Sequence, residues 1–510
     1  MTRVARRAWL PESLAASLAG LQRGQAVWLV GGAVRDAFLE RASVDLDLVV
    51  DREAIALARR LADAWDADFY ALDAERDIGR VLLSRADLGI RTLDFSGLRQ
   101  SDIVSDLRAR DFTINAMAVP LAAPGQLLDP CGGLQDLRDG RLRACSAGAI
   151  AADPVRALRA VRLAAELSLR IEPETHSQVA KAAPALSAVS AERIRDELFL
   201  IFGQPRPARA LRVLDHTGLL AVIFPDLQPL RGLQQPPPHT RDAWDHTLAV
   251  MDALSDVLSV LAPQHDEEKA ADLTLGQISV RLGRFRDALN RHLGTRLSAG
   301  RSARQVLFLS ALYHDAGKPQ TVSRHSDGRI HFHRHERAGA SMAEARGRAL
   351  RLSGAEVDRL RQTVAQHMRP MWLEGQVSAR AAYRFFHQAG EAGVDVVVLS
   401  LADLLGVQVP PPAQDRWQAR LEVARHLLEA YFERNDQAVN PPPLVRGDEL
   451  VETLGIAPGP EIGRLLRGIG EAQAAGTVHT RAEALDLARD LHQTPAASAE
   501  ADERAPDDYG

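Results

Sequence analysis

The chain has 510 residues, and a prior of roughly 100–200 residues per domain predicts three or four domains. Hydrophobic residues make up 46% and charged residues 25%, which excludes wholesale disorder and a fibrous repeat. The net charge of −5 excludes a strongly basic chain, so any contact with nucleic acid must come from local basic patches. The chain contains two cysteines, which excludes a disulfide framework and a cysteine-built zinc site.

The termini and the hydropathy predict a cytoplasmic protein. The N-terminus is rich in arginine but lacks an apolar segment, and no run of about 18 apolar residues occurs anywhere. We therefore expect neither export nor membrane insertion. Three triple-proline clusters, at 236–238, 410–412 and 441–443, cannot continue helices or central strands and mark boundaries along the chain.

The first 140 residues have the pattern of a mixed α/β domain. Short apolar runs at 27–30, 46–50 and 90–95 predict strands, and 54–65 predicts an amphipathic helix. From about residue 141 the strand signals fade, and the spacing of apolar residues at 155–167 and 191–201 predicts helices. We expect the remainder to be almost entirely helical, ending in a disordered tail at 494–510.

A glycine pair follows the first predicted strand. Gly31 and Gly32 lack side chains, so their backbone amides can approach a phosphate closely, and Arg35 follows at the start of a predicted helix. This arrangement is typical of a triphosphate cradle. The simpler interpretation is a tight turn after a strand, and the glycines alone do not decide between the two.

Two carboxylates open the next predicted strand. Because side chains alternate along a strand, Asp45 and Asp47 lie on the same face. Two like charges held together favour a divalent cation, and Mg²⁺ prefers carboxylate and phosphate oxygens. Paired metal ions can activate an attacking 3′-hydroxyl and stabilise a leaving pyrophosphate. The alternative is a charged strand end without a ligand.

Together with the segment 110–116 (Arg-Asp-Phe-Thr-Ile-Asn-Ala), these motifs resemble the class II tRNA nucleotidyltransferase and bacterial poly(A) polymerase family. The resemblance continues through 129–133, 153–162 and 192–194 and spans roughly residues 26–230. It implies an α+β multidomain fold: a polymerase-β-like head with a mixed sheet and helices, followed by helical neck, body and C-terminal regions.

The resemblance also implies roles for individual residues. It places Gly31, Gly32 and Arg35 near the triphosphate and Arg110 beside the incoming nucleotide. It makes Asp45 and Asp47 the ligands of Mg²⁺. Asp94, in the third predicted strand, stands where the family has a further acidic group that assists the metal or the hydroxyl; a solvent-facing carboxylate is the alternative.

In this family the incoming base is read by protein side chains, and the resemblance assigns that task to Asp153 and Arg156. Three residues apart at a predicted helix start, they share a face, where the carboxylate accepts from an exocyclic amine and the guanidinium donates to ring acceptors. Both C and A carry such an amine. Asp153 is alternatively a helix N-cap ahead of Pro154. Arg159 and Arg162 extend the basic stripe toward nucleotide phosphates, or form a solvated helix face.

The resemblance implies tRNA, CTP and ATP as substrates, but three features depart from the family pattern. Ala152 replaces a usual glutamate and Ala109 a usual arginine, and only residues 96–110 separate the strand ending at Phe95 from Asp111. Members of the family that build the whole CCA end usually have a longer flexible loop there, whereas a short one resembles the CC-adding specialists. Full CCA addition and CC addition both stay open.

Histidines and aspartates in the second half form a separate pattern. Each of these residues is a weak signal alone. Folding can bring their imidazoles and carboxylates together as ligands of a divalent transition metal of unknown identity. The pattern resembles the HD phosphohydrolase superfamily and predicts activity on RNA ends or phosphate esters. The core ligands are His246, His314, Asp315 and Asp403, with the adjacent His-Asp pair on a helix, and His335 and His367 match additional histidines of phosphodiesterase-type members. We assign His325, His331 and His333 to a polar loop outside this site.

We therefore predict five regions: a nucleotidyltransferase head at 1–140, a helical neck and RNA-binding region at 141–235, an HD domain at 236–410, a C-terminal helical region at 411–493 and the tail at 494–510. Poly(A) polymerase is an alternative function, disfavoured by the acidic tail and the HD pattern. An HD phosphohydrolase regulated by a non-catalytic head and a non-catalytic RNA-binding protein are alternatives from other classes, disfavoured by the intact Asp45, Asp47 and Arg110.

Overall fold

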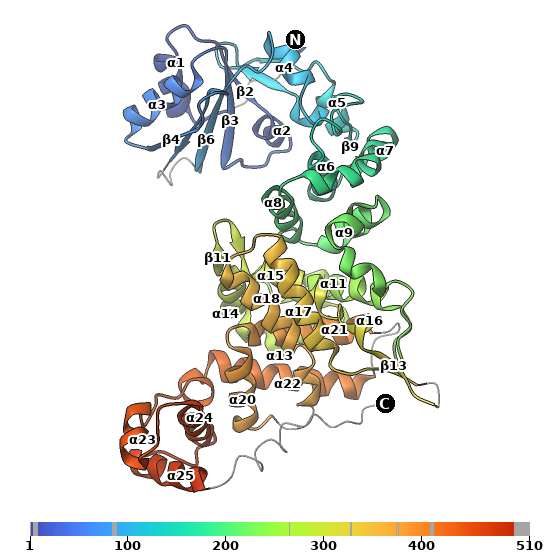
Figure 1. Ribbon diagram of the computed structural model, residues 1–510. Helices are drawn as coiled ribbons and strands as arrows, with labels where there is room; N and C mark the ends of the chain where they lie inside the picture. The colour runs from blue at the N-terminus through green and yellow to red at the C-terminus, as the bar shows by residue number, and fades with distance from the viewer. Residues whose placement is uncertain are drawn as a thin grey trace. The chain divides into compact units, whose positions relative to one another are not determined.

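The computed structural model describes residues 2–3, 9–83, 89–264, 266–326, 329–373, 375, 377–407 and 413–493 (Figure 1). The chain forms two compact units, one made of Met1–Glu197 and Arg212–Ile223 and the other of Leu198–Leu211 and Phe224–Gly510. The first carries a mixed sheet and the second is mainly helical, which confirms the predicted α+β fold class. The predicted tail lies outside the described residues, and the five finer regions stay a prediction.

A six-stranded sheet in the order β4-β5-β6-β3-β2-β7 forms the centre of the first unit. β3 and β6 are parallel, and all other neighbours are antiparallel. The strands are β2 Val27–Val30, β3 Asp45–Val50, β4 Asp68–Asp73, β5 Ile78–Leu82, β6 Thr92–Gly97 and β7 Ala118–Pro120. The predicted strands at 27–30 and 46–50 are confirmed, and the third begins and ends two residues later than predicted.

One face of this sheet is covered by helices. α3 Ala54–Trp65, predicted at the same residues, packs on β5 and β6, and α1 Glu12–Leu21 packs against α3. Leu46 and Leu48 of β3 join Leu57 and Leu61 of α3 in a core in which full burial of each leucine contributes about 1.5–3 kcal/mol. Alternation therefore directs the odd-numbered residues of β3 to the opposite face.

The rest of the first unit is helical with two short two-stranded ladders. The helices are α2 Gly32–Phe38, α4 Ile103–Arg108, η2 Thr113–Asn115, α5 Gly133–Arg138, α6 Arg156–Glu166, α7 Pro173–Ala182, η3 Ala183–Ala188 and α10 Leu219–Ile223. The unit bounds divide two further helices, α8 Ala191–Phe202 and α9 Pro207–His216. β1 Thr2–Arg3 pairs with β8 Gln126–Leu127, and β9 Arg141–Leu142 with β10 Arg170–Ile171. The predicted helices at 155–167 and 191–201 correspond to α6 and α8.

The second unit is a helical assembly. Its main helices are α11 Ala243–Val260, α13 Leu273–Leu282, α14 Arg286–Gly294, α15 Ala303–Tyr313, α17 His335–Ala349, α18 Gly354–Gln366, α20 Ala379–Ala389, α21 Ala392–Gly406 and α22 Gln414–Phe432. Shorter helices are η4 Pro225–Leu230, α12 Glu267–Ala270, η5 Gly283–Phe285, α16 Lys318–Thr321, α19 Arg369–Trp372 and η6 Asn435–Val439. Two hairpins, β11 Arg296–Ser298 with β12 Arg301–Ser302 and β13 Val322–Arg324 with β14 Ile330–Phe332, interrupt the predicted all-helical region.

Helix packing positions the ligands of this unit. α11 packs along α21 and α17 along α18, while α15 contacts α11, α17, α18 and α21. α21 is apolar on all sides and buried along most of its length, as expected for a central helix. α23 Gly447–Leu454, α24 Pro460–Ala474 and α25 Arg481–Gln493 form a small core of their own near the C-terminus.

Candidate active site and metal centre

The turn after β2 is shaped by contacts that exclude a side chain. Gly31 has φ of 73°, and a Cβ atom added to it would lie 3.2 Å from Arg110 Nη1 and 3.5 Å from Asp47 Oδ2. The left-handed backbone and this close approach both favour glycine. The turn therefore brings bare backbone beside a carboxylate and a guanidinium, as a nucleotide cradle requires.

The carboxylates of the head lie on neighbouring strands. Asp47 is the register partner of Asp94 across the parallel β3–β6 pair, and Asp45 and Asp47 share the exposed face of β3 as predicted. Although part of Asp47 reaches solvent, the protein atoms around it raise its pKa by desolvation, and Asp94 and Asp45 raise it further against the opposing effect of Arg110. A divalent cation would relieve this repulsion.

Asp94 has a partner that sequence reasoning missed. Arg80 of β5, its register partner, donates to both carboxylate oxygens at 2.7 and 2.8 Å, and this hydrogen bonding raises the pKa of Arg80. Asp94 can therefore contact a metal or a hydroxyl directly only if Arg80 releases one of the two Asp94 carboxylate oxygens. A lone cation in an otherwise apolar strand was the available signal, but the strand itself was not predicted.

Two arginines lie under the glycine turn. Arg35 is buried, and its guanidinium donates to Asp36 at 2.8 Å and to Asn115 at 2.7 Å. Arg110 lies 3.6 Å from Asp106, and its buried Nε has no hydrogen-bond partner among the described residues. A buried unpaired donor is costly, so the Arg110 position fits an anionic ligand. The exposed carboxylates and this donor together fit a metal-bound triphosphate.

The predicted arginine stripe is tied into an ion-pair network. Arg159 Nη1 lies 3.1 Å from Asp111, and Arg159 and Arg162 reach opposite oxygens of Glu197 at 2.9 and 2.7 Å. Burial opposes the charged form of Arg159, but Glu197 and Asp111 raise its pKa overall. Glu197, which is almost fully buried and which sequence reasoning missed, therefore fixes both guanidinium groups.

The proposed base-selecting pair differs from its prediction. α6 begins at Arg156, so Asp153 lies in the preceding turn, where its carbonyl accepts from the Arg156 backbone, and it is not the N-cap. Its carboxylate is 2.6 Å from Arg193, and that contact outweighs partial burial and lowers the Asp153 pKa. Arg156 Nη1 donates to the Ala149 carbonyl at 2.9 Å.

The second unit gathers all six predicted metal-binding residues. Histidines at the ends of helices supply three of them: His314 caps the C-terminus of α15, His335 begins α17, and His367 caps α18. His246 lies within α11, and Asp403 lies near the end of α21. The prediction that His314 and the adjacent aspartate sit on a helix is wrong in detail, because α15 ends at Tyr313.

The histidine tautomers follow from their hydrogen bonds. In three of the histidines Nδ1 lies 2.7–2.9 Å from a backbone carbonyl: His314 from Ala311, His335 from Phe332 and His367 from Val364. A carbonyl only accepts, so each Nδ1 carries a proton, and in the neutral form of the ring each Nε2 presents a lone pair. The Nε2 atoms of His314 and His246 lie 3.4 Å apart. Those of His335 and His367 lie 3.3 Å apart. Such convergence of lone pairs fits a metal cation.

The ligands form two groups that share Asp315. His246, His314 and Asp403 offer ligand atoms within 4.8 Å of one another, and so do Asp315, His335 and His367. Asp315 Oδ2 lies 3.2 Å from His314 Nε2, and Oδ1 lies 3.4 Å from His335 Nε2. One carboxylate oxygen is therefore directed at each group, which fits two bridged divalent ions.

The charges in this centre suit metal binding. Burial opposes ionisation of Asp315 and Asp403, but the surrounding histidines, and Lys318 beside Asp315, hold both pKa values well below their usual range. Burial and the neighbouring histidines lower the pKa of His367 to about 3. Burial opposes the charged form of His314, but Asp315 and Asp403 raise its pKa overall, so a metal bound there would displace a proton from this ring. Ionised carboxylates and neutral imidazoles are the forms that bind metals.

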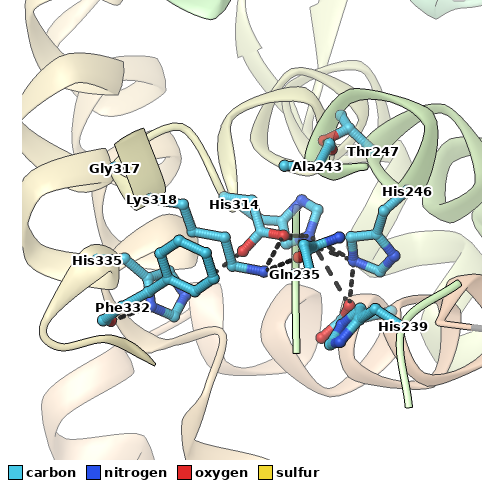
Figure 2. Close-up of polar contacts among 12 residues, drawn as sticks. Gln235, His239, Ala243, His246, Thr247, His314, Gly317, Lys318, Phe332 and His335 are labelled. Carbon is cyan, nitrogen blue, oxygen red and sulfur yellow. Dashed lines mark hydrogen bonds and ion pairs between the residues drawn. The ribbon is translucent and has the colours of Figure 1, made fainter. Parts of the chain in front are cut away.

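Figure 2 shows three residues at this centre that sequence reasoning left without a role. Lys318 Nζ donates to Asp315 at 2.7 Å and to Gln235 at 2.6 Å. His239 packs edge-on against His246 with ring centroids 5.2 Å apart, and burial with the charge of Lys318 lowers its pKa to about 4. Lys318 follows the predicted ligand Asp315 by three residues, whereas Gln235 and His239 lie in a proline-rich stretch with no such signal.

Three family models match the chain: the poly A polymerase head domain at residues 27–143, the probable RNA and SrmB-binding site of polymerase A at 168–230, and the HD domain at 276–406. His246 lies before the last match. Nucleotidyltransferase and HD domains generally use divalent metals. None of the helices in the described residues is long and apolar enough to cross a membrane.

Solved structures share the fold. A CCA-adding enzyme in complex with ATP matches with a TM-score of 0.60 at 19% identity, covering 94% of this chain and 95% of the other. The Thermotoga maritima CCA-adding enzyme complexed with tRNA matches with a TM-score of 0.54 at 18% identity, covering 94% of both chains.

Sequence relatives are closer. The A-adding tRNA nucleotidyltransferase of Deinococcus radiodurans is 34% identical over 89% of this chain and 93% of its own length. The CC-adding tRNA nucleotidyltransferase of Geobacter sulfurreducens is 32% identical over 92% of this chain and 93% of its own length. Identity above 30% over nearly the whole of both chains shows that this chain is an enzyme of the tRNA nucleotidyltransferase family.

Proposed function

We propose that this enzyme adds part of the CCA end to tRNA, using CTP or ATP, and does not build the whole end. The proposal rests on the short connection after β6, because the strand ends at Gly97 and α4 begins at Ile103. The family members that add all three nucleotides usually have a longer flexible loop between these elements. Here residues 98–102 make the connection, and the Asp102 side chain accepts from the Ser105 backbone to cap α4 at once.

Two sequence relatives favour a partial-end specialist, while CCA-adding enzymes share the fold over 94% of this chain. The A-adding and CC-adding relatives align over about nine-tenths of this chain, whereas the multifunctional CCA protein of Nitrosococcus oceani aligns over 46% of this chain and 59% of its own length. A-adding and CC-adding enzymes are both similar to this chain, so an experiment must decide whether it adds C or A.

The head geometry supports nucleotidyl transfer at the exposed face of β3. Asp45 and Asp47 would hold Mg²⁺, which when bound activates the primer 3′-hydroxyl and stabilises the departing pyrophosphate. Arg110 would donate to the triphosphate through the side chain whose Nε now lacks a partner. The backbone of Gly31 and Gly32 allows close approach of the phosphates, and Arg35 supports the turn from beneath.

The second group of head residues would choose and orient the base. Asp153 accepts from the exocyclic amine of C or A, and Arg156 donates to ring acceptors. Arg159 and Arg162 are held by Glu197 and would contact nucleotide phosphates from a fixed position. Asp94, paired with Arg80, would orient the hydroxyl or a metal once the nucleotide is bound.

The second unit would hydrolyse phosphate esters at RNA ends. Its six ligands, His246, His314, Asp315, His335, His367 and Asp403, would hold divalent transition metals, because imidazole-rich sites favour those over Mg²⁺. Lys318 neutralises the shared carboxylate and orients it. We also place the enzyme in the cytoplasm, since a chain with two free cysteines suits a reducing compartment.

An extension assay with labelled nucleotides tests this function. tRNA ending before C74 and tRNA ending after C75 are each given CTP alone, ATP alone or both. We expect either two C residues on the first tRNA or one A on the second, and no addition with Asp45→Ala. Asp403→Ala, which changes only the second unit, serves as the matched control and retains addition.

Complete CCA addition to the first tRNA would contradict the partial-end proposal while leaving the family intact. Long A tracts on RNAs unrelated to tRNA would favour poly(A) polymerase. If wild type and Asp45→Ala were equally inactive on every tRNA while phosphatase activity persisted, the head would be regulatory and the proposal wrong.

A further inference from the structure

Three histidines outside the six-ligand centre converge on one hairpin. β13 and β14 pair with Ser323 opposite His331, and the ladder continues to His325, whose backbone N–H donates to the Arg329 carbonyl at 2.9 Å. His333 directly follows β14 and its ring stacks on that of His331, so the two lie on one side of the hairpin, and the register places His325 beside His331. The assignment of these histidines to a polar loop is therefore wrong for His331, which lies within β14.

The imidazole rings are close enough to share one ion. Ring centroids of His325 and His331 lie 4.5 Å apart, and the parallel rings of His331 and His333 lie 5.4 Å apart. One nitrogen of each ring lies within 4.8 Å of the others. Zn–N bonds of about 2.0–2.1 Å bring tetrahedral ligand atoms to about 3.4 Å. Small rotations of partly exposed side chains are enough to close that difference.

This cluster is separate from the six-ligand centre, although the chain links them directly. Arg334 lies between His333 and His335 and has φ of 60°, a left-handed conformation that ends the strand direction. His333 therefore stays with the hairpin, while His335 begins α17 and hydrogen-bonds the Phe332 carbonyl at 2.9 Å. None of the three hairpin histidines belongs to the two ligand groups built around Asp315.

We propose that His325, His331 and His333 form a further binding site for a divalent transition metal, with Zn²⁺ as the representative ion. Three neutral imidazoles suit such a metal and not Mg²⁺, whose preferred ligands are oxygens. Two of the three side chains are exposed and the third is half-buried, so water or a phosphate oxygen can complete the coordination. The site would hold its ion at the surface, beside the strand that leads into His335.

The test measures bound Zn²⁺ in the full-length protein by equilibrium dialysis and elemental analysis. The variant His325→Ala/His331→Ala/His333→Ala removes the hairpin imidazoles. The matched control, His176→Ala/His216→Ala/His479→Ala, removes three exposed histidines elsewhere. We expect the hairpin variant to bind one equivalent fewer than wild type, and the control to match wild type.

A second probe separates metal binding from loss of structure. Co²⁺ bound by several imidazoles gives visible absorption bands, which the hairpin variant should lose in part while its circular dichroism and unfolding midpoint stay unchanged. Equal Zn²⁺ stoichiometry and equal affinity in wild type and the hairpin variant would overturn the proposal. If the variant instead lost affinity for tRNA in the presence of a chelator, with stoichiometry unchanged, the hairpin would be an RNA contact and not a metal site.

Discussion

The two candidate metal centres of this enzyme differ in their exposure and in the type of their ligands. The head displays carboxylates of adjacent strands, with Asp45 and Asp47 exposed and no histidine among its predicted ligands. The second unit encloses four histidines and two aspartates contributed by helices and helix ends, and only Asp403 among them is partly exposed. An open oxygen site suits an ion that arrives with a nucleotide, whereas an enclosed imidazole site suits ions that stay.

The electrostatics show the same contrast. In the head, desolvation by the surrounding protein atoms and like charges raise the pKa of Asp47, so the carboxylate lacks sufficient countercharge of its own. In the second unit the histidines and Lys318 lower the pKa values of Asp315 and Asp403. In the head, repulsion between carboxylates stays until a cation binds. In the second unit, the histidines and Lys318 already balance much of the negative charge of the carboxylates.

The largest expected effect is on catalysis in the head. Asp47→Asn keeps the shape of the side chain but removes its charge, and we expect nucleotide addition to fall about 10³-fold, because a metal ion supplies several kcal/mol of transition-state stabilisation. Steady-state extension of tRNA under saturating nucleotide measures the change. Phosphatase activity should stay within about twofold of wild type; a parallel loss of both activities would mean that the two centres are coupled.

The reciprocal change lies in the second unit. Asp315→Asn removes the carboxylate shared by both ligand groups, so we expect loss of phosphohydrolase activity and of metal bound at this centre. Elemental analysis after dialysis and hydrolysis of a cyclic phosphate ester report the two losses. Nucleotide addition should persist, with Asp45→Ala as the matched negative control. Retention of bound metal by Asp315→Asn would show that the bridging interpretation is wrong.

Sequence reasoning found the parts of each centre that local patterns determine. Alternation along one strand was enough to place Asp45 and Asp47 on one face, because the period of a strand does not depend on its neighbours. The residues of the second centre were each a weak signal alone and were found because the set resembles the HD pattern. Their division into two groups around Asp315 needed the fold.

Partners contributed by distant segments could not be predicted. The pairing of Arg80 with Asp94 depends on the strand order β5-β6-β3, which no local pattern determines. A helix cap was the alternative interpretation of Asp153 because Pro154 follows it, but α6 begins later and Arg193 contacts the carboxylate. Glu197 joins two arginines of α6 from α8, a contact between helices that their amphipathic patterns do not specify.

A smaller effect concerns stability of the second unit. Glu356 is fully buried and accepts from Arg301 at 2.6 and 2.9 Å, and these bonds outweigh desolvation and lower its pKa to about 2. We expect Glu356→Gln to lower the free energy of unfolding by about 3 kcal/mol at pH 7, since the Arg301 guanidinium loses the charge of its buried carboxylate partner. Urea unfolding followed by circular dichroism measures it.

The pH dependence of Glu356 gives a further check with a matched control. A carboxyl whose folded pKa is below its unfolded value stabilises the protein fully above about pH 4.5 and loses that contribution as pH falls toward about 2. The difference between wild type and Glu356→Gln should shrink in that window. Glu344→Gln, at the more exposed pair with Arg348, should change stability by less than about 1 kcal/mol; equal effects of both changes would contradict the assignment.

The smallest effect has the opposite sign and lies in the head. The Asp47 pKa is raised in the folded state, so the folded protein binds a proton more readily than the unfolded chain and gains stability as pH falls toward the unfolded value near 3.8. At pH 7 the ionised carboxylate therefore costs stability, and Asp47→Asn should raise the unfolding midpoint of the head slightly in metal-free buffer. Added Mg²⁺ with nucleotide should stabilise wild type more than the variant, since only wild type keeps both carboxylates. Calorimetry in chelator and in Mg²⁺ with nucleotide measures both shifts. A lower midpoint for Asp47→Asn in chelator would mean that Asp47 stabilises the fold, and the contrast between a site that needs its ligand and one already balanced would fail.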